Sequence, residues 1–203
     1  MSSYLSVQSL ILIEAIVELV KKESTVHAGN VATLLEPLAI SEAVAELLEA
    51  EVTFDSLLGF ATACTDNATR LNLVQGMLEY APEECKKQRF RVMRLLDEDS
   101  LNLLFQEEIL LELQDELWEN SDSYAFENQI LNIHYKAELT EVIVENLHLR
   151  QGAKGIEFGG DFHVGSSLGG FNGKFAGLYE ESGFKIADVE IDTSNYYGES
   201  EDE

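Results

Sequence analysis

Residues 156–179 read IEFGGDFHVGSSLGGFNGKFAGLY, and this stretch decides the fold of the second half of the chain. Its first part alternates small or polar residues with the apolar residues Ile156, Phe158, Phe162 and Val164. Alternation with a period of two predicts a strand with one buried face. Turn residues at 166–170 and 180–183 bracket a second strand at 171–179 and introduce a third at 184–191. We therefore expect an antiparallel meander.

Glycine is concentrated in the same region, where eleven of the 14 glycines lie between Gly152 and Gly198. These glycines do not match a phosphate-binding loop, because no helix start follows them and no Gly-Lys-Ser or Gly-Lys-Thr occurs. Glycine inside a strand leaves a bare strip of backbone that another surface can approach closely. Two interpretations stay open: a strip that packs on a partner, and a loosely specified curved module with glycine at bends and bulges.

Two further segments extend the β region toward the N-terminus. Residues 131–139 alternate with a period of two and predict a half-buried strand. Residues 140–149 fit two descriptions, because one face of a helix is also marked by Leu139, Val142, Ile143 and Leu147. Their β-branched content favours the strand.

The first 120 residues have the pattern of helices on short connections. Pro37 ends or kinks the segment before it, and Pro82 fits a first-turn position. Helix caps are indicated at Ser41, Thr53, Asp66 and Asp99. These signals predict a compact orthogonal bundle of about six or seven helices, and no fixed period supports a helical-repeat solenoid.

The first helix is apolar around most of its circumference. Its polar residues form one strip, which consists of Glu14, Glu18, Lys21 and Lys22. Such a helix belongs in the middle of a bundle or at a subunit interface. The apolar stretch from Leu5 to Val20 is shorter than a membrane span and contains two glutamates, so we expect neither a membrane span nor an export signal.

The chain is strongly acidic, because 38 Asp and Glu face 13 Lys and Arg in 203 residues, which gives a net charge of −25. The acidic excess occurs in both halves of the chain. Such a surface repels phosphate backbones and anionic headgroups, which excludes general nucleic-acid binding. Two cysteines are too few for a disulfide scaffold or a four-ligand zinc site. We expect a cytoplasmic protein without a cofactor.

Five of the chain's 13 cations lie between residues 86 and 94, where Lys87, Arg91 and Arg94 share one helical stripe. One interpretation is an anion site for a phosphate or an acidic partner. The favoured interpretation is internal pairing with the acidic helix that follows, because sequential helices on a short connection pack antiparallel. That helix carries Glu108, Glu112, Asp115, Glu116 and Glu119.

No pattern indicates a catalytic centre or a metal site. A helical di-metal site needs a Glu-x-x-His pair on each of two helices, and only residues 145–148 have this spacing. One hypothesis is a metal-dependent hydrolase that uses His134 and His163. The carboxylates near them in the sequence are Glu138, Glu157 and Asp161. Solvated histidines on strand surfaces are the simpler interpretation.

The whole sequence predicts an α+β protein with a compact helical bundle at residues 1–120, a glycine-rich antiparallel β module at 125–195 and an acidic tail at 196–203. The expected function is non-enzymatic protein–protein interaction or assembly through the β module, as a homo-oligomer or part of a larger assembly. The residues expected to carry the contacts are Phe158, Phe162, Phe171, Phe175, Tyr179, Lys87, Arg91 and Arg94. The alternative is an acidic mimic of nucleic acid that occupies the basic cleft of a nucleic-acid-binding protein.

Overall fold

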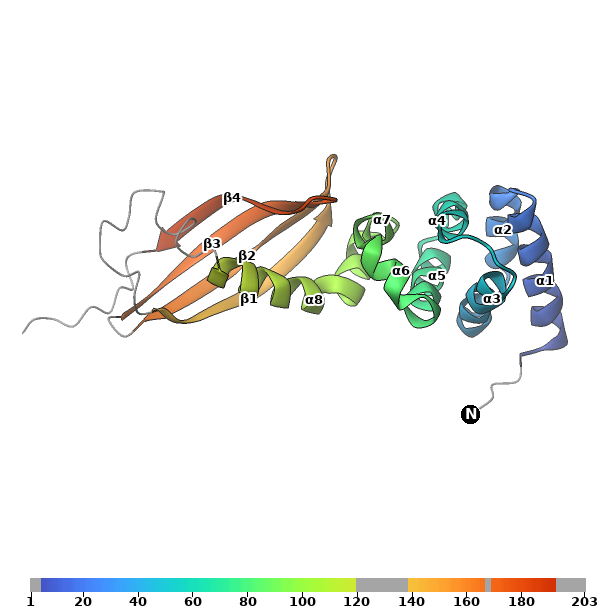
Figure 1. The fold of residues 1–203 in the computed structure, drawn as a ribbon, viewed down its shortest axis with the longest axis horizontal. Coiled ribbons are helices and arrows are strands. Elements are labelled where there is room, and N and C mark those ends of the chain that lie inside the picture. Colours follow the sequence, from blue (N-terminus) through green and yellow to red (C-terminus); the bar gives the residue numbers. More distant parts are fainter. Residues whose placement is uncertain (1–4, 120–138, 167–168, 193–203) are drawn as a thin grey trace, which may run out of the picture. The chain divides into compact units, whose positions relative to one another are not determined.

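The computed structural model describes residues 5–119, 139–166 and 169–192. They form eight helices followed by four strands (Figure 1), which confirms the predicted α+β fold with its helices first and its antiparallel sheet last. The helices are α1 (Val7–Lys21), α2 (Thr25–Ala32), α3 (Pro37–Glu49), α4 (Phe54–Ala63), α5 (Asn67–Tyr80), α6 (Pro82–Lys87), α7 (Arg89–Met93) and α8 (Glu98–Glu119). The strands are β1 (Leu139–Gln151), β2 (Ile156–Ser166), β3 (Gly169–Glu180) and β4 (Gly183–Asp192).

The chain divides into two compact units, Met1–Asp97 and Glu98–Glu203. The helices α1 to α7 lie in the first unit, and α8 lies in the second, where it packs on β1. This grouping differs from the sequence prediction, which placed α8 in the helical domain because it continues the run of helices. The acidic tail at 196–203 and all but the last residue of the strand predicted at 131–139 lie outside the described residues.

Three predicted helix starts in the first unit are confirmed. The Thr53 hydroxyl accepts a hydrogen bond from the Ser56 N–H at 3.2 Å, and the Asp66 carboxylate accepts one from the Thr69 N–H at 2.7 Å. Pro82 occupies the first turn of α6. The two caps satisfy N–H groups that a helix leaves without an internal partner. Hydrogen bonds from the Thr69 hydroxyl and N–H also hold the pKa of Asp66 below its ordinary value.

The cap predicted at Ser41 is wrong, because α3 already begins at Pro37 and Ser41 lies inside the helix. Pro37 starts the helix since the N–H that proline lacks is one that a first turn leaves unbonded. The Ser41 hydroxyl instead donates to a Glu79 carboxylate oxygen of α5 at 3.3 Å. Here α5 approaches α3 so closely that a Cβ on Gly76 would lie 3.1 Å from the Cα of Ser41.

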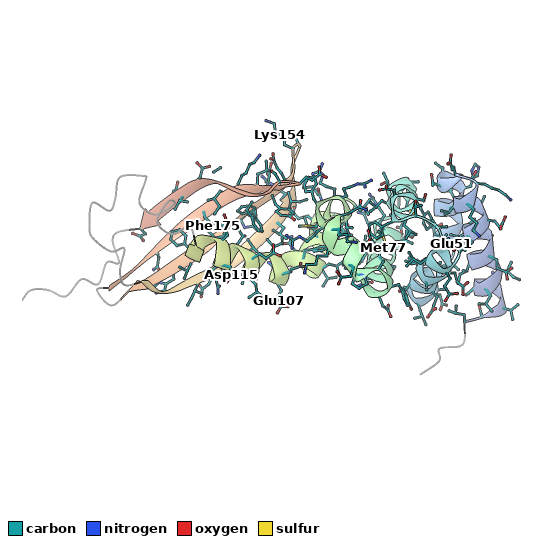
Figure 2. The ribbon with its side chains drawn as sticks, viewed as in Figure 1. Glu51, Met77, Glu107, Asp115, Lys154 and Phe175 are labelled. Carbon is teal, nitrogen blue, oxygen red and sulfur yellow. The ribbon has the colours of Figure 1, made fainter. Side chains whose placement is uncertain are left out.

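Apolar side chains fill the space between the helices of the first unit. The largest fully buried ones are Ile16, Leu47, Leu57, Phe60, Leu73, Met77 and Met93. Met77 lies among the packed helices in Figure 2. The helix α1 turns only one side to this core, and Val7, Leu10 and Ile11 on its other side are 74%, 48% and 60% exposed. Within the described residues α1 is therefore not surrounded by other helices, and its position at a subunit interface stays a prediction.

The four strands form one sheet in the order β1-β2-β3-β4, and every neighbouring pair is antiparallel. Residues 140–149 belong to β1, which confirms the strand over the helix. Between Glu145 and His148, β1 has one residue more than β2, and Asn146 at this bulge has a φ of +52°. Asparagine tolerates this left-handed conformation better than most residues. The Asn146 amide donates to Asp161 of β2 at 2.8 Å, which ties the bulge to the neighbouring strand.

Glycine and phenylalanine lie opposite each other across β2 and β3. The register pairs are Phe158 with Gly177, Gly160 with Phe175, and Phe162 with Gly173. In each pair the ring covers the glycine; a Cβ on Gly160, for example, would lie 3.1 Å from the ring of Phe175. The rings also approach one another, with 6.1 Å between the centroids of Phe158 and Phe175. These glycines therefore make room for aromatic rings in the core of the sheet.

Candidate functional site

Side-chain amides of α8 close the outer edge of β1. The Asn102 side chain accepts a hydrogen bond from the Leu149 N–H at 2.9 Å and donates one to the Leu149 carbonyl oxygen at 2.8 Å. Further along α8, Gln106 donates to the carbonyl oxygen of Leu147, and Gln114 accepts from the Val144 N–H. An open strand edge is a template for pairing with another chain. By satisfying these backbone groups, α8 removes that possibility from β1.

The opposite edge of the sheet belongs to β4, and no described strand or helix pairs with its outer side. Compared with β3, β4 has one additional residue, Ala187, between Ile186 and Asp188. This bulge divides the edge into two short stretches, at 183–186 and 188–192. A bulge interrupts the regular hydrogen-bonding pattern of an edge, which disfavours pairing with an arbitrary long strand. This edge is therefore suited to a short partner strand with side chains complementary to those of β4.

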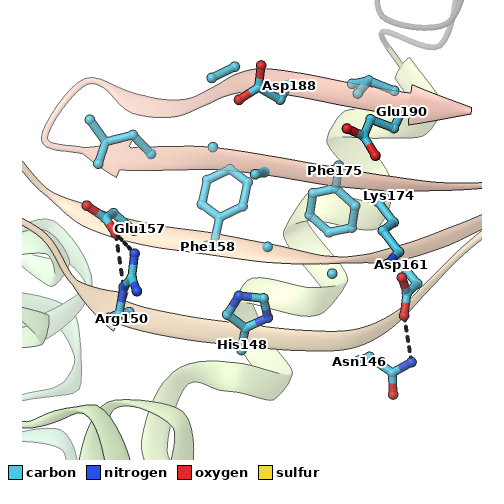
Figure 3. Close-up of a pocket in the computed structure, with 17 residues that line it drawn as sticks. Asn146, His148, Arg150, Glu157, Phe158, Asp161, Lys174, Phe175, Asp188 and Glu190 are labelled. Atoms are coloured by element: carbon cyan, nitrogen blue, oxygen red, sulfur yellow. Dashed lines mark hydrogen bonds and ion pairs between the residues drawn. The ribbon is translucent and has the colours of Figure 1, made fainter.

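A pocket of about 860 Å³ hollows the polar face of the sheet (Figure 3). Its centre is one row of residues that lie side by side across the strands: His148, Gly159, Ala176 and Asp188. Gly159 and Ala176 are small, so the surface dips between the longer side chains of the neighbouring rows. The His148 imidazole lies over Gly159, where a Cβ would come within 2.9 Å of the ring.

Charged side chains of both signs surround this pocket. Arg150 of β1 pairs with Glu157 of β2, and the hydrogen bond and charge of Glu157 raise the pKa of Arg150 (Figure 3). Lys174 of β3 lies in register between Asp161 of β2 and Glu190 of β4. Such a rim offers donors and acceptors to a polar or charged segment. The β4 side of the pocket adjoins the outer edge described above.

The aromatic residues predicted to carry contacts lie inside the β module. Phe158, Phe162, Phe175 and Tyr179 are 3–7% exposed. The ring of Phe175 lies near those of Phe158 and Phe162, and all three cover the glycines opposite them, whereas Tyr179 lies against Phe184. Phe171 is in register with Val164 of β2, and its side chain lies outside the described part. In this conformation the four described rings stabilise the sheet, and their role in binding stays a prediction.

The predicted basic stripe lies on two short helices, because the helix expected at residues 83–96 is divided into α6 and α7. Lys87 pairs with Glu84 of α6 at 2.6 Å, and Arg91 pairs with Asp55 of α4 at 2.5 Å. Arg94 is exposed at the C-terminal end of α7. The two named partners lie in the first unit, whereas the predicted pairing required the acidic residues of α8. External binding of an anion by this stripe stays a prediction.

The predicted histidine site falls only partly on the described residues. The His163 Nδ1 hydrogen-bonds with the Asn172 Oδ1 at 2.7 Å, and His134 lies outside the described part. Among the described residues, no three His, Cys, Asp or Glu side chains are placed to hold a metal ion. Both cysteines are buried free thiols, and burial raises the pKa of Cys64 and of Cys85 to about 11.

Comparison of the chain with protein-family models, with curated proteins and with solved structures finds no match. In the part of the chain that the structure describes, no helix combines the length and the apolar content needed to cross a bilayer. A functional proposal therefore rests on the geometry of the molecule itself.

Proposed function

We propose that the protein is a non-enzymatic interaction protein that associates with a second copy of itself by joining two β4 strands edge to edge. The difference between the two sheet edges supports this proposal. Amides of α8 close the β1 edge, whereas no described element covers the outer side of β4. Antiparallel joining of two such edges makes one continuous sheet and pairs the outer backbone groups of both strands.

The sequence of β4 is complementary to itself in one antiparallel register. When Lys185 lies opposite Glu190 of the second copy, Ile186 lies opposite the second copy's Val189. Directly opposed side chains in an antiparallel pair are close enough to interact. Lys185 and Glu190 share a face, because their register partners Leu178 and Lys174 on β3 are an even number of residues apart. Residues 185 and 190 are five apart and would lie on opposite faces of a regular strand, but the extra residue Ala187 brings them to the same face.

Two features of the single chain oppose the association and keep it weak. Lys185 already pairs with Glu180 across the β3–β4 hairpin, but the Lys185 side chain is 60% exposed. An exposed ion pair contributes less than about 1 kcal/mol, so Lys185 can exchange one glutamate for another. The net charge of −25 makes two copies repel each other. Specific pairing at β4 must therefore exceed this repulsion.

Exchange of the two charges tests the proposed register. In sedimentation equilibrium of the full chain, Lys185→Glu and Glu190→Lys should each weaken self-association by about tenfold, because each replaces opposite charges by like charges. The double variant K185E/E190K restores opposite charges at both positions and should regain the affinity of the wild type. The control Glu180→Gln removes the competing internal partner of Lys185 and should not weaken association.

Two results would overturn the proposal. A wild-type protein that stays monomeric up to about millimolar concentration shows that the edge does not pair. A double variant as weak as the single variants shows that Lys185 and Glu190 are not opposed. The other functions predicted from the sequence, nucleic-acid mimicry and a metal-dependent hydrolase, stay predictions, and no feature of the described residues favours either of them over association.

A further inference from the structure

A second surface, in the first unit, is a groove of about 600 Å³ between α1 and α3. Its apolar lining includes Leu10, Ile13 and Val17 of α1. Leu10 is 48% exposed, and its neighbours Val7 and Ile11 on the same helix are more exposed still. Contiguous apolar side chains at a surface mark a place where another molecule binds.

Glutamates from both helices surround these apolar side chains. Glu14 and Glu18 lie one turn apart on α1, and Glu42, Glu46 and Glu49 follow helical spacing on α3. Among the described residues that line the groove there is no lysine or arginine. Glu18 pairs with Lys22 at 3.2 Å, but both side chains are more than 60% exposed, so this pair contributes little. The groove therefore combines apolar contacts with a strongly negative potential.

We propose that this groove binds a basic amphipathic helix of another protein. The apolar side of such a helix would cover Leu10 and Val17, and lysines or arginines at its flanks would meet the glutamates of α1 and α3. The same glutamates repel nucleic acids and anionic lipid surfaces. This surface is separate from the β4 edge, so the inference does not depend on self-association.

A second copy of the chain fits this groove poorly. The predicted basic stripe lies on α6 and α7, which have only six and five residues. The α3 side of the groove extends from Glu42 to Glu49, about two turns of helix, and a helix that follows it needs more than two turns with its own apolar stripe. A longer cationic helix from a different protein has the required length and charge.

A designed peptide probes the groove directly. The peptide has about 18 residues, with leucine at helical i, i+3, i+4 and i+7 spacing and lysine at the flanking positions. Fluorescence anisotropy of the labelled peptide with the full-length protein at about 0.05 M salt should give a Kd on the order of micromolar. A scrambled peptide of the same composition keeps the charge and loses the apolar stripe, so it should bind at least about tenfold more weakly.

Two double variants with the same change in net charge separate the groove from the general acidity of the chain. Glu46→Lys with Glu49→Lys reverses two exposed charges at the groove, and Glu107→Lys with Asp115→Lys reverses two exposed charges on α8. The groove variant should weaken peptide binding by about tenfold or more, and the α8 variant by about threefold or less. Far-UV circular dichroism checks that both variants stay folded.

Equal weakening by the two double variants would overturn the proposal, because the peptide would then be responding to net charge alone. Equal binding of the amphipathic and scrambled peptides would also overturn it, since the apolar lining would then contribute nothing. Absence of binding to the wild-type protein would refute the site outright. In each case sedimentation of the unlabelled protein reports the β4 association separately.

Discussion

Replacement of Asn102 by alanine should open the protected edge of the sheet. The Asn102 amide satisfies both the N–H and the carbonyl oxygen of Leu149, a residue with no exposed surface. An unsatisfied buried backbone group costs about 1–3 kcal/mol. Because both hydrogen bonds to Asn102 are only partly buried, we expect Asn102→Ala to lower the free energy of unfolding of the second unit by about 2–4 kcal/mol.

The matched control is Asn72→Ala in α5. Asn72 also lies inside a helix and donates to a backbone carbonyl, that of Ala68, but this hydrogen bond is exposed. Both substitutions change helix propensity equally, and the control should change stability by less than about 0.5 kcal/mol. The difference between the two variants isolates the contribution of the strand edge.

Urea denaturation measures this difference with two probes. The fluorescence of Trp118, the one tryptophan of the chain, reports unfolding of the second unit, to which α8 belongs, and far-UV circular dichroism reports the helices of the first unit. Hydrogen exchange of the Leu149 amide gives an independent measurement, and Asn102→Ala should increase its rate. If both variants lower stability equally, or if hydrogen exchange at the Leu149 N–H is as slow as in the wild type, then the Asn102 side chain does not protect this edge.

Two more predictions concern glycine packing and the thiols. Gly177→Ala should destabilise the protein by more than about 2 kcal/mol in urea denaturation, because the added Cβ would lie 2.5 Å from the Lys185 carbonyl oxygen. The control is Gly59→Ala in α4, where the added Cβ would have no neighbour within 4 Å. This substitution should stabilise the protein by about 0.5–1 kcal/mol, because alanine favours a helix more than glycine does. Equal effects of these two alanines would contradict the packing. Burial raises the pKa of Cys64 and of Cys85 from 9.0 to about 11, and only the thiolate reacts. At pH 8 both thiols should therefore react with a disulfide reagent about a hundredfold more slowly than an unperturbed thiol. The rate should rise about tenfold per pH unit up to pH 10. Rapid, stoichiometric labelling of the native protein at pH 8 would contradict the burial of the thiols.

Local signals in the sequence predicted most of the elements. The period-two pattern gave the strands of the meander, and the side chains of Thr53 and Asp66 marked helix starts because a cap depends only on residues within one turn. The helix start predicted at Ser41 was wrong, because serine also occurs inside helices, and α3 begins earlier, at Pro37.

The candidate surfaces were harder to predict, because they depend on which elements meet. Asn102, Gln106 and Gln114 lie four and eight residues apart, a regular spacing that is visible in the sequence. Their function becomes evident only once α8 packs on β1, whose backbone they satisfy. The five glutamates of the α1–α3 groove come from two helices and likewise gather only through tertiary packing.

The alternation of rings and glycines also makes the alignment of β2 with β3 selective during folding. A shift by two residues in one direction would oppose Phe158 to Phe175 and Gly160 to Gly173; this follows from the observed pairing. Two rings would then compete for the space of one, and a void would open where two glycines meet. A misaligned hairpin is thus destabilised both by the clash of rings and by the void. The glycine-rich strands β2 and β3 therefore have fewer competing alignments than their composition suggests.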